Sequence, residues 1–157
     1  MEQIIVRKAT LDDMDTLLLF EQGVIAAERP FDITLKNDPI RYYDIEKMIT
    51  AAHVELLVAT LNSTIIGSGY ARIENAKPFL RYEQYAYLGF MYVLPEYRGK
   101  GVNKLIIDAL AGWSASKNIT ELRLEVYQNN EPAIKAYEKT GFTKLLVEMR
   151  MEIKSNQ

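Results

Sequence analysis

Residues 93–104 constrain the fold of this chain more than any other part of its sequence. They read VLPEYRGKGVNK and follow an apolar run that stops at Pro95. Gly99 and Gly101 come next, and an amphipathic stretch at helical spacing begins at Val102. A strand that leads through a glycine-rich turn into a helix offers unpaired backbone N–H groups to an anion, and glycine lets a phosphate approach the main chain. The segment therefore predicts either an anion site or an ordinary strand-to-helix connection with solvated bases.

A second segment, residues 122–142, reads LRLEVYQNNEPAIKAYEKTGF. Together the two segments resemble the GNAT superfamily of acyl-CoA-dependent N-acetyltransferases. The first signature of that family is Arg/Gln-x-x-Gly-x-Gly/Ala, and it is matched here by Arg98, Gly101 and, imperfectly, Asn103. The second signature is matched in spacing by Asn130, Ala133, Tyr137, Gly141 and Phe142. The resemblance covers residues 54–142 well, and the N-terminal third only in its order of elements.

Hydrophobic periodicity predicts an α/β (α+β) chain that alternates short strands with amphipathic helices. The strands are expected at residues 4–9, 55–60, 64–73, 84–94 and 121–127, and the helices at residues 10–27, 42–52, 102–113 and 130–141. This order belongs to a mixed, mostly antiparallel central sheet flanked by helices on both faces, and the resemblance implies the GNAT-like acyl-CoA N-acyltransferase fold. We expect residues 1–157 to form a single domain.

The C-terminal tail departs from the family pattern. The resemblance implies two strands joined by a loop after Phe142, but residues 145–154 alternate apolar and polar side chains with no Gly, Pro or Asn turn between them. We therefore predict one long final strand. Such a strand would leave a sheet edge open, through which a homodimer could form.

Composition narrows the class of protein. Hydrophobic residues at 48% and charged residues at 25% are ordinary for a globular chain. The absence of cysteine excludes disulfides and thiol nucleophiles, and with a single histidine it argues against a metal site. No apolar run approaches the roughly 18 residues of a membrane span and no signal-like N-terminus is visible, so a cytoplasmic protein without a membrane partner is expected. A net charge of −2 without a basic cluster argues against nucleic acid.

The resemblance implies acetyl-CoA as co-substrate and assigns residues to it. The backbone of Met91, Tyr92 and Val93 is expected to pair with the pantetheine arm like an added strand, with an N–H of Met91 or Tyr92 facing the thioester oxygen. Asn130, Ala133 and Tyr137 are expected beside the cofactor. The pyrophosphate is expected to meet mainly backbone N–H groups of Arg98, Gly99, Lys100, Gly101, Val102, Asn103 and Lys104. Asn103 replaces the usual Gly or Ala but keeps its N–H, so the site is expected to persist.

The reaction that the resemblance implies is N-acetylation of a primary amine. With no cysteine and no evident Ser–His pair, direct attack in a ternary complex is expected rather than a covalent enzyme intermediate. Tyr137 is the predicted catalytic acid, because a phenol near the sulfur can protonate the leaving thiolate. Ala133, four residues earlier on the same helix face, leaves space beside it.

The general base stays open at the level of sequence. Some family members carry a Glu on the fourth strand, where this chain has Tyr87. Glu83 lies four residues earlier and is the candidate that we name as a catalytic residue. Glu125 on the neighbouring strand is a second acid, and Tyr85 and Tyr92 add phenols to the same ribbon.

The acceptor is expected to meet residues 29–41 and the helix that follows, again by resemblance. Acids and aromatic residues gather there, which suits a cationic small-molecule or peptide amine or, equally, a solvated loop. They are Glu28, Asp32, Asp38, Tyr42, Tyr43 and Asp44. The alternative function is a non-catalytic acyl-CoA-binding sensor or interaction module, which would keep residues 98–104 but need no base.

Overall fold

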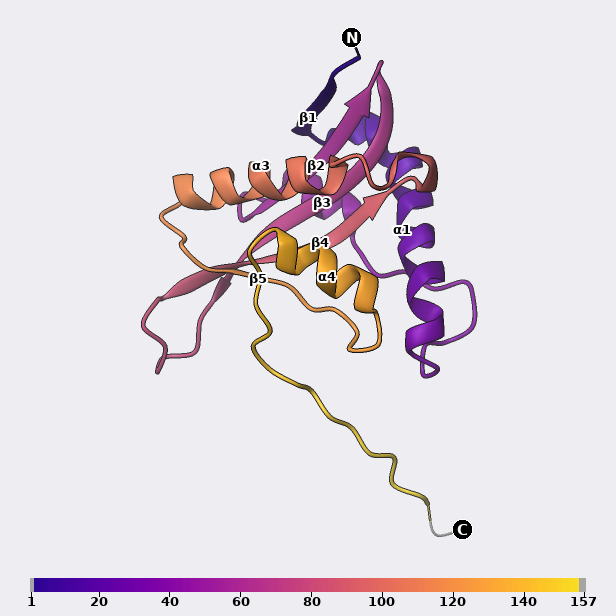
Figure 1. Ribbon diagram of the computed structural model, residues 1–157, viewed down its shortest axis with the longest axis vertical. Helices are drawn as coiled ribbons and strands as arrows, with labels where there is room; N and C mark the ends of the chain where they lie inside the picture. Colours follow the sequence, from indigo (N-terminus) through magenta and orange to yellow (C-terminus); the bar gives the residue numbers. More distant parts are fainter. Residues whose placement is uncertain (1, 156–157) are drawn as a thin grey trace. The chain divides into compact units, whose positions relative to one another are not determined.

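A five-stranded sheet is the central element of the N-terminal part of the chain (Figure 1). The computed structural model describes residues 2–155 and divides the chain into two compact units, the first ending at Glu125 and the second beginning at Val126. The sheet belongs to the first unit and has the order β1-β2-β3-β4-β5. Neighbouring strands are antiparallel except β4 and β5, which are parallel. The strands are β1 (Ile4–Lys8), β2 (Val54–Leu61), β3 (Thr64–Asn75), β4 (Gln84–Val93) and β5 (Leu122–Arg123).

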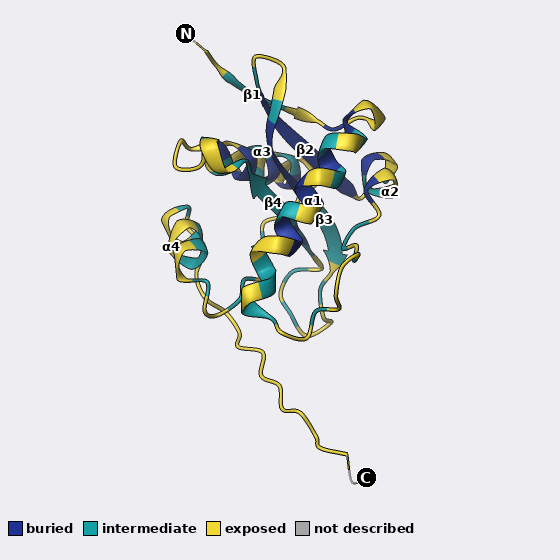
Figure 2. Ribbon diagram, turned by 90° about the vertical axis from the view of Figure 1, so that its right-hand side faces the viewer, coloured by how far each residue is buried: buried dark blue, intermediate teal, exposed yellow. Residues whose placement is uncertain are grey.

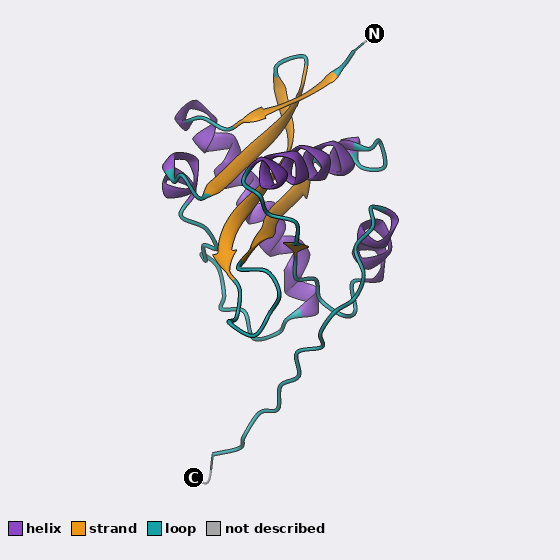
Figure 3. Cartoon of the chain, turned by 90° about the vertical axis from the view of Figure 1, so that its left-hand side faces the viewer, coloured by secondary structure: helices purple, strands orange, loops and turns teal. Residues whose placement is uncertain are grey.

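Helices cover both faces of this sheet, so the predicted mixed, mostly antiparallel architecture is confirmed. Helix α3 crosses one face and α1 runs along the other (Figures 1 and 3). The α-helices of the first unit are α1 (Met14–Glu28), α2 (Ile45–Thr50) and α3 (Val102–Ser116), and its 3-10 turns are Leu11–Asp13, Arg29–Phe31 and Pro95–Tyr97.

Strand alternation divides the core between the two faces of the sheet. Val58 of β2 joins the cluster formed by α1 and α2. Its neighbours Leu57 and Ala59 are also buried, but they point to the opposite face because successive strand residues alternate. Figure 2 shows the buried residues concentrated in the strands and on the inner sides of the helices. The core of the α1 face consists of Ala9, Leu17, Phe20, Val24, Ile45, Ile49, Val54, Leu56, Val58, Tyr70 and Phe90.

Two glycines of β3 let α3 approach the sheet closely. A Cβ atom on Gly69 would lie 2.6 Å from the sulfur of Met91 and 2.8 Å from Cγ2 of Ile106. A Cβ atom on Gly67 would lie 3.0 Å from the backbone oxygen of Tyr92. The Gly-Ser-Gly stretch at residues 67–69 therefore serves helix–sheet packing.

We expect Gly69→Ala to lower the free energy of unfolding by about 1–2 kcal/mol, because the added methyl overpacks the contact between α3 and β3. Urea unfolding of the two proteins measures the difference. Gly112→Ala is the matched control, because a Cβ atom at this position of α3 meets no atom within 4 Å. A control as destabilised as Gly69→Ala would contradict the packing argument.

Two elements are shorter than their sequence predicts. Helix α2 begins at Ile45 rather than at residue 42, because the side chain of Asp44 caps it by accepting from the N–H of Lys47 at 3.2 Å. Strand β5 covers Leu122–Arg123 of the predicted 121–127, and it pairs with β4 only over this stretch.

The second unit contains helix α4 (Glu131–Lys139), capped as predicted by Asn130, whose side chain accepts from the N–H of Ala133. The single final strand predicted for residues 145–154 does not form within one chain, since residues 143–155 have no regular secondary structure. The physical reason is that an alternating pattern supplies two different faces but not the partner whose backbone completes a ladder.

Candidate functional site

Strand β4 carries a β-bulge near its C-terminal end. Gly69 of β3 stands opposite two residues of β4, Phe90 and Met91, because the register shifts at this point. Phe90 has a φ of +55°, which a bulky residue rarely adopts. Its ring stacks on Tyr43 with centroids 4.6 Å apart, and its carbonyl accepts from the hydroxyl of Ser68 at 3.0 Å. These contacts hold a bulge that redirects the end of β4, a device frequent beside active sites.

The edge of β4 that follows its short pairing with β5 is open. The ladder between them joins Ala86 to Leu122 and Tyr87 to Arg123 and goes no further in the part of the chain that the structure describes. Residues 88–93 therefore present backbone N–H and C=O groups along an edge without a strand partner on that side. Such an edge can accept an extended ligand as an additional strand.

Two side chains next to this edge pack on opposite faces of the sheet. Met91 lies on the α3 side of the sheet, because a Cβ atom added to Gly69 would meet both the sulfur of Met91 and the side chain of Ile106 on α3. Tyr92 points to the opposite face, where its ring lies 4.9 Å from that of Phe20 on α1. Of the predicted residues 91–93, Met91 and Tyr92 thus have side chains that pack against the helices.

The turn after β4 contains two glycines with positive φ and leads into the start of α3. Gly99 and Gly101 have φ of +77° and +82°, and a Cβ atom on either would meet nothing within 4 Å. Helix α3 starts at Val102, so its first N–H groups lack partners inside the helix and its dipole is positive at this end. Val102 itself is buried in the core and can contribute only its backbone. The space beside both glycines is thus open.

The basic side chains of this turn are partly committed to the protein. Arg98 folds back on β4, where its Nε donates to the carbonyl of Val93 at 2.8 Å and its guanidinium lies over the ring of Tyr92. Lys104 pairs with Asp108 at 2.7 Å along the helix. Lys100 is exposed. The side chains of Arg98 and Lys104 are thus already held by the carbonyl of Val93 and by Asp108.

A tyrosine of β4 is joined to an acid of the neighbouring chain segment. The hydroxyl of Tyr87 donates to Oε1 of Glu125 at 2.8 Å. Burial and this hydrogen bond raise the pKa of Tyr87 well above its ordinary value, so the phenol stays protonated and remains a donor. Arg72 covers the rings of Tyr87 and Tyr70, and its charge is shared with Glu74. Glu125 is exposed. Its described partner in this group is the hydroxyl of Tyr87, whereas Glu74 is paired with Arg72.

A buried carboxylate that the sequence did not single out orders the expected acceptor segment. Glu21 on α1 is fully buried and accepts from the N–H groups of Tyr42 and Tyr43 at 2.8 and 2.7 Å. Its other oxygen accepts from Arg41 at 2.5 Å. The position of Glu21 among the apolar residues of α1 was the one available signal. By fixing Tyr43, this carboxylate supports the ring that stacks on Phe90 in the bulge.

Several acids expected to face the acceptor are engaged in local structure. Asp38 pairs with Arg29 at 2.7 Å, Asp32 accepts from the N–H of Thr34, and Asp44 caps α2. These contacts make residues 29–44 an ordered loop and leave fewer free carboxylates than the sequence suggested.

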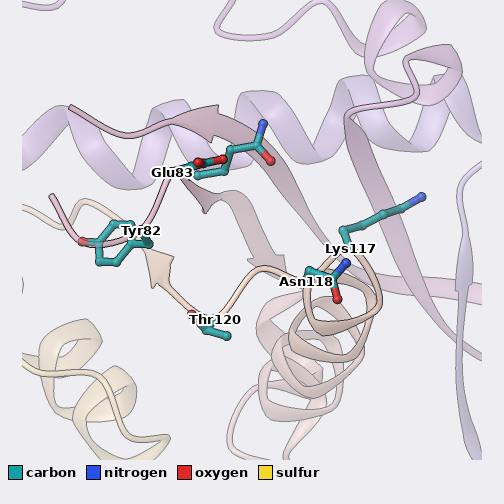
Figure 4. Close-up of a pocket in the computed structure, with 6 residues that line it drawn as sticks. Tyr82, Glu83, Lys117, Asn118 and Thr120 are labelled. Carbon is teal, nitrogen blue, oxygen red and sulfur yellow. The ribbon is translucent and has the colours of Figure 1, made fainter. Parts of the chain in front are cut away.

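Glu83 lies far from the bulge. It directly precedes β4 and lines a shallow pocket of about 320 Å³ with Tyr82, Gln84, Lys117, Asn118 and Thr120 (Figure 4). Met91 is eight residues further along the chain, which corresponds to about 26 Å of strand. The structure thus does not bring Glu83 to the residues predicted to hold the thioester.

The remaining predicted residues belong to the second unit, which begins at Val126. Asn130 caps α4 and Ala133 lies in its first turn. Tyr137 is half-buried, and its ring meets that of Phe142 edge-on at 5.8 Å. Gly141, with a φ of +109°, follows the helix end. The signature residues of the second segment are thus gathered on one short helix and the turn after it.

Metal-ligating side chains and membrane-spanning helices are two further features on which the geometry of residues 2–155 bears. In this range no three or more His, Asp or Glu side chains come together as metal ligands. None of the helices in the same range has the length and apolar character needed to cross a bilayer.

Comparison with known proteins links these features to one family. The model of the acetyltransferase (GNAT) family matches residues 22–142. An N-alpha-acetyltransferase of Saccharolobus solfataricus is 26% identical over 147 residues, which cover 90% of this chain and 81% of the relative. A Clostridium acetobutylicum structure described as a predicted acetyltransferase with acetyl-CoA matches 96% of each chain with a TM-score of 0.69 and 20% identity. An aminoglycoside N-acetyltransferase in complex with CoA matches 96% of this chain and 100% of its own, with a TM-score of 0.73 and 18% identity.

Proposed function

Because the chain belongs to the GNAT family of acetyltransferases, we propose that it moves the acetyl group of acetyl-CoA to a primary amine by direct attack in a ternary complex. The observation that carries this proposal is the open edge of β4 at residues 88–93, which leads directly into the glycine turn at the start of α3. The open edge suits the amide-bearing pantetheine arm of acetyl-CoA, and the glycine turn suits its phosphates. The bound acetyl-CoA in the Clostridium acetobutylicum structure agrees with this choice of co-substrate.

In the proposed complex the backbone of Met91, Tyr92 and Val93 pairs with the pantetheine arm, and an N–H of Met91 or Tyr92 faces the thioester oxygen. The pyrophosphate meets the N–H groups of residues 98–104, including that of Asn103. Lys100 adds an exposed positive charge beside them.

We assign the general base to Glu125 in place of Glu83. Glu125 lies on the segment next to β4 and is oriented by the hydroxyl of Tyr87, the residue that stands where some relatives carry a glutamate. An exposed carboxylate can take the proton of an incoming ammonium group directly or through one water molecule. The phenol of Tyr87, with its raised pKa, serves as the donor that holds this carboxylate.

The reaction then runs in one exchange of bonds. Glu125 first takes one proton from the ammonium group, which frees the nitrogen lone pair. The nitrogen then attacks the thioester carbon, the C–N bond forms and the C–S bond breaks, and Tyr137 gives its proton to the departing sulfur. The second proton of the nitrogen returns to Tyr137, and Glu125 releases its proton to solvent. The acceptor is proposed to be a cationic amine of a small molecule or a peptide, because the rings of Tyr70 and Tyr87 and the carboxylate of Glu125 lie together beside this part of β4.

Free-thiol release from acetyl-CoA, measured with a panel of amines and peptide N-termini, tests the proposal. We expect turnover with one class of acceptor and a decrease in kcat of about tenfold for Tyr137→Phe, because thiolate is a fair leaving group without an acid. Tyr85→Phe is the control, since the ring of Tyr85 packs on Arg123 and has no place in the mechanism. Binding of acetyl-CoA without turnover of any acceptor would contradict the reaction and favour an acyl-CoA-binding module.

A further inference from the structure

Arg72 of β3 is held over two tyrosine rings on the face of the sheet that carries the candidate base. Its guanidinium carbon lies 5.5 Å from the ring centre of Tyr70 and 5.3 Å from that of Tyr87. Arg72 stands opposite Tyr87 in the ladder between β3 and β4, so the two side chains leave the sheet on the same face. An arginine stacked on aromatic rings in this way is oriented before any ligand arrives.

The guanidinium group of Arg72 is only partly used by the protein. Its Nε donates to Oε1 of Glu74, and its Nη1 makes a long contact of 3.4 Å to the hydroxyl of Tyr70. Within the described residues, Nη2 donates to no acceptor of the protein. The side chain is 40% exposed, so an anion in solution has access to it. A planar pair of guanidinium N–H groups matches a carboxylate, which accepts two parallel hydrogen bonds.

These N–H groups lie beside the place of the proposed reaction. Tyr87 has Arg72 over its ring and Glu125 at its hydroxyl, so the guanidinium and the candidate base flank one side chain. The hydroxyl of Tyr70 lies over Gly89, because a Cβ atom at this glycine would be 2.5 Å from it. Gly89 directly precedes the bulge of β4. An acceptor whose amine meets Glu125 therefore has an arginine beside it.

Arg123 of β5 is a similar arginine that faces the other end of β4. Its Nε donates to Glu121, two residues earlier, and its guanidinium lies over the rings of Tyr82 and Tyr85. Its Nη2 donates to the hydroxyl of Tyr82, which precedes β4. Arg123 thus has the chemistry of Arg72 but is directed toward the start of β4 and away from the bulge, which makes it a matched control.

We propose that Arg72 binds a carboxylate of the acceptor, and that the acceptor is a small amino acid with this carboxylate close to its amine. The inference rests on the proposed function, because it takes Glu125 as the group that meets the amine. In this complex the ammonium group faces Glu125, and the carboxylate accepts from Nη1 and Nη2 of Arg72. The two protein groups have opposite charge and flank the ring of Tyr87, which complements the paired charges of an amino acid. A peptide N-terminus carries an amide in place of this carboxylate.

Matched acceptors test the carboxylate. The free-thiol assay gives kcat/KM for the common amino acids, for their α-carboxamides and for the amines that remain when the carboxyl group is removed. We expect one amino acid to exceed both of its analogues by roughly 10- to 100-fold, the range of hydrogen bonds to a charged group. The carboxamide has a more acidic ammonium group and would be the better acceptor if the carboxylate were not bound. Turnover of the analogues at an equal or higher rate would overturn the inference and leave the acetyl transfer in place.

Arg72→Gln should lower kcat/KM for the amino acid by roughly 10- to 100-fold and leave that for its carboxamide nearly unchanged. The carboxamide is an internal control, because damage to the fold or to the contact between Tyr87 and Glu125 lowers both values alike. Arg72→Lys keeps the charge without the planar fork and should recover part of the loss. Arg123→Gln should leave the preference for the amino acid unchanged. An equal loss on both substrates in Arg72→Gln would count against a carboxylate contact.

Binding of the acetylated product separates this inference from the reaction itself. N-acetylalanine keeps the carboxylate and requires no catalysis, so an NMR titration can follow the side-chain N–H signals of Arg72. We expect N-acetylalanine to shift these signals and N-acetylalaninamide to leave them in place. A shift without turnover of any amine would support the carboxylate site and contradict the proposed transfer. No shift with either compound would overturn the carboxylate site, even with turnover present.

Discussion

Replacing Glu125 by glutamine is expected to lower kcat about 100-fold while leaving the affinity for acetyl-CoA unchanged. Glutamine keeps the size of the side chain and still accepts from the hydroxyl of Tyr87, but it cannot take a proton from the amine. General acid–base groups typically contribute 10²- to 10⁴-fold. The loss should shrink as pH rises, because a growing fraction of an amine with a pKa near 10 is then already deprotonated in solution.

The matched control for this change is Glu74→Gln. Glu74 is an acid of the same neighbourhood, but it serves Arg72 rather than Tyr87. We expect its kcat to stay within about twofold of the wild type. Tyr87→Phe should fall between the two variants, since it keeps the ring under Arg72 and removes only the hydroxyl that orients Glu125. An unchanged kcat in Glu125→Gln would remove Glu125 from the mechanism, whatever acceptor is used.

Replacing Glu21 by alanine is expected to lower the free energy of unfolding by about 3 kcal/mol. The change leaves the backbone N–H groups of Tyr42 and Tyr43 without their acceptor, and an unsatisfied donor costs about 1–3 kcal/mol. It also opens a cavity beneath α1. The ion pair with Arg41 adds little, since that side chain is 54% exposed.

Urea unfolding of two further variants separates these contributions. Glu21→Gln should lose less than the alanine variant, because the amide oxygen still accepts from a backbone N–H. Glu46→Ala removes an exposed acid from α2 and should change the free energy of unfolding by less than about 0.5 kcal/mol. Equal stability of wild type and Glu21→Ala would contradict the anchoring of residues 41–43 by this carboxylate.

The glycine turn, the two helix starts and the β2–β3 hairpin could be predicted from the sequence because each depends on a few neighbouring residues. Pro95 and the two glycines after it end a strand and start a helix whatever surrounds them, and Asn130 caps the helix that follows it. The hairpin of β2 and β3 followed from alternation on both sides of a short turn. These features depend on a few neighbouring residues, and the structure reproduces them.

The general base could not be chosen from local sequence patterns. From the sequence, Glu83 is the named candidate, with Glu125 and the tyrosines at positions 85, 87 and 92 of the same ribbon beside it. Their separation depends on which carboxylate meets Tyr87 across two chain segments that are 38 residues apart. Likewise, Glu21 is an ordinary helix acid until the chain twenty residues later folds onto it.

By itself the sequence determined the order of the strands and helices, the glycine turn at the start of α3 and the family resemblance, since these depend on backbone preferences and spacing along the chain. Only the tertiary structure decided that Phe90 bulges with a positive φ, that the edge of β4 stays open beyond Tyr87, and that residues 143–155 form no strand. A bulge, an edge and a ladder are properties of pairs of distant segments. Their energies come from contacts that the local pattern does not contain.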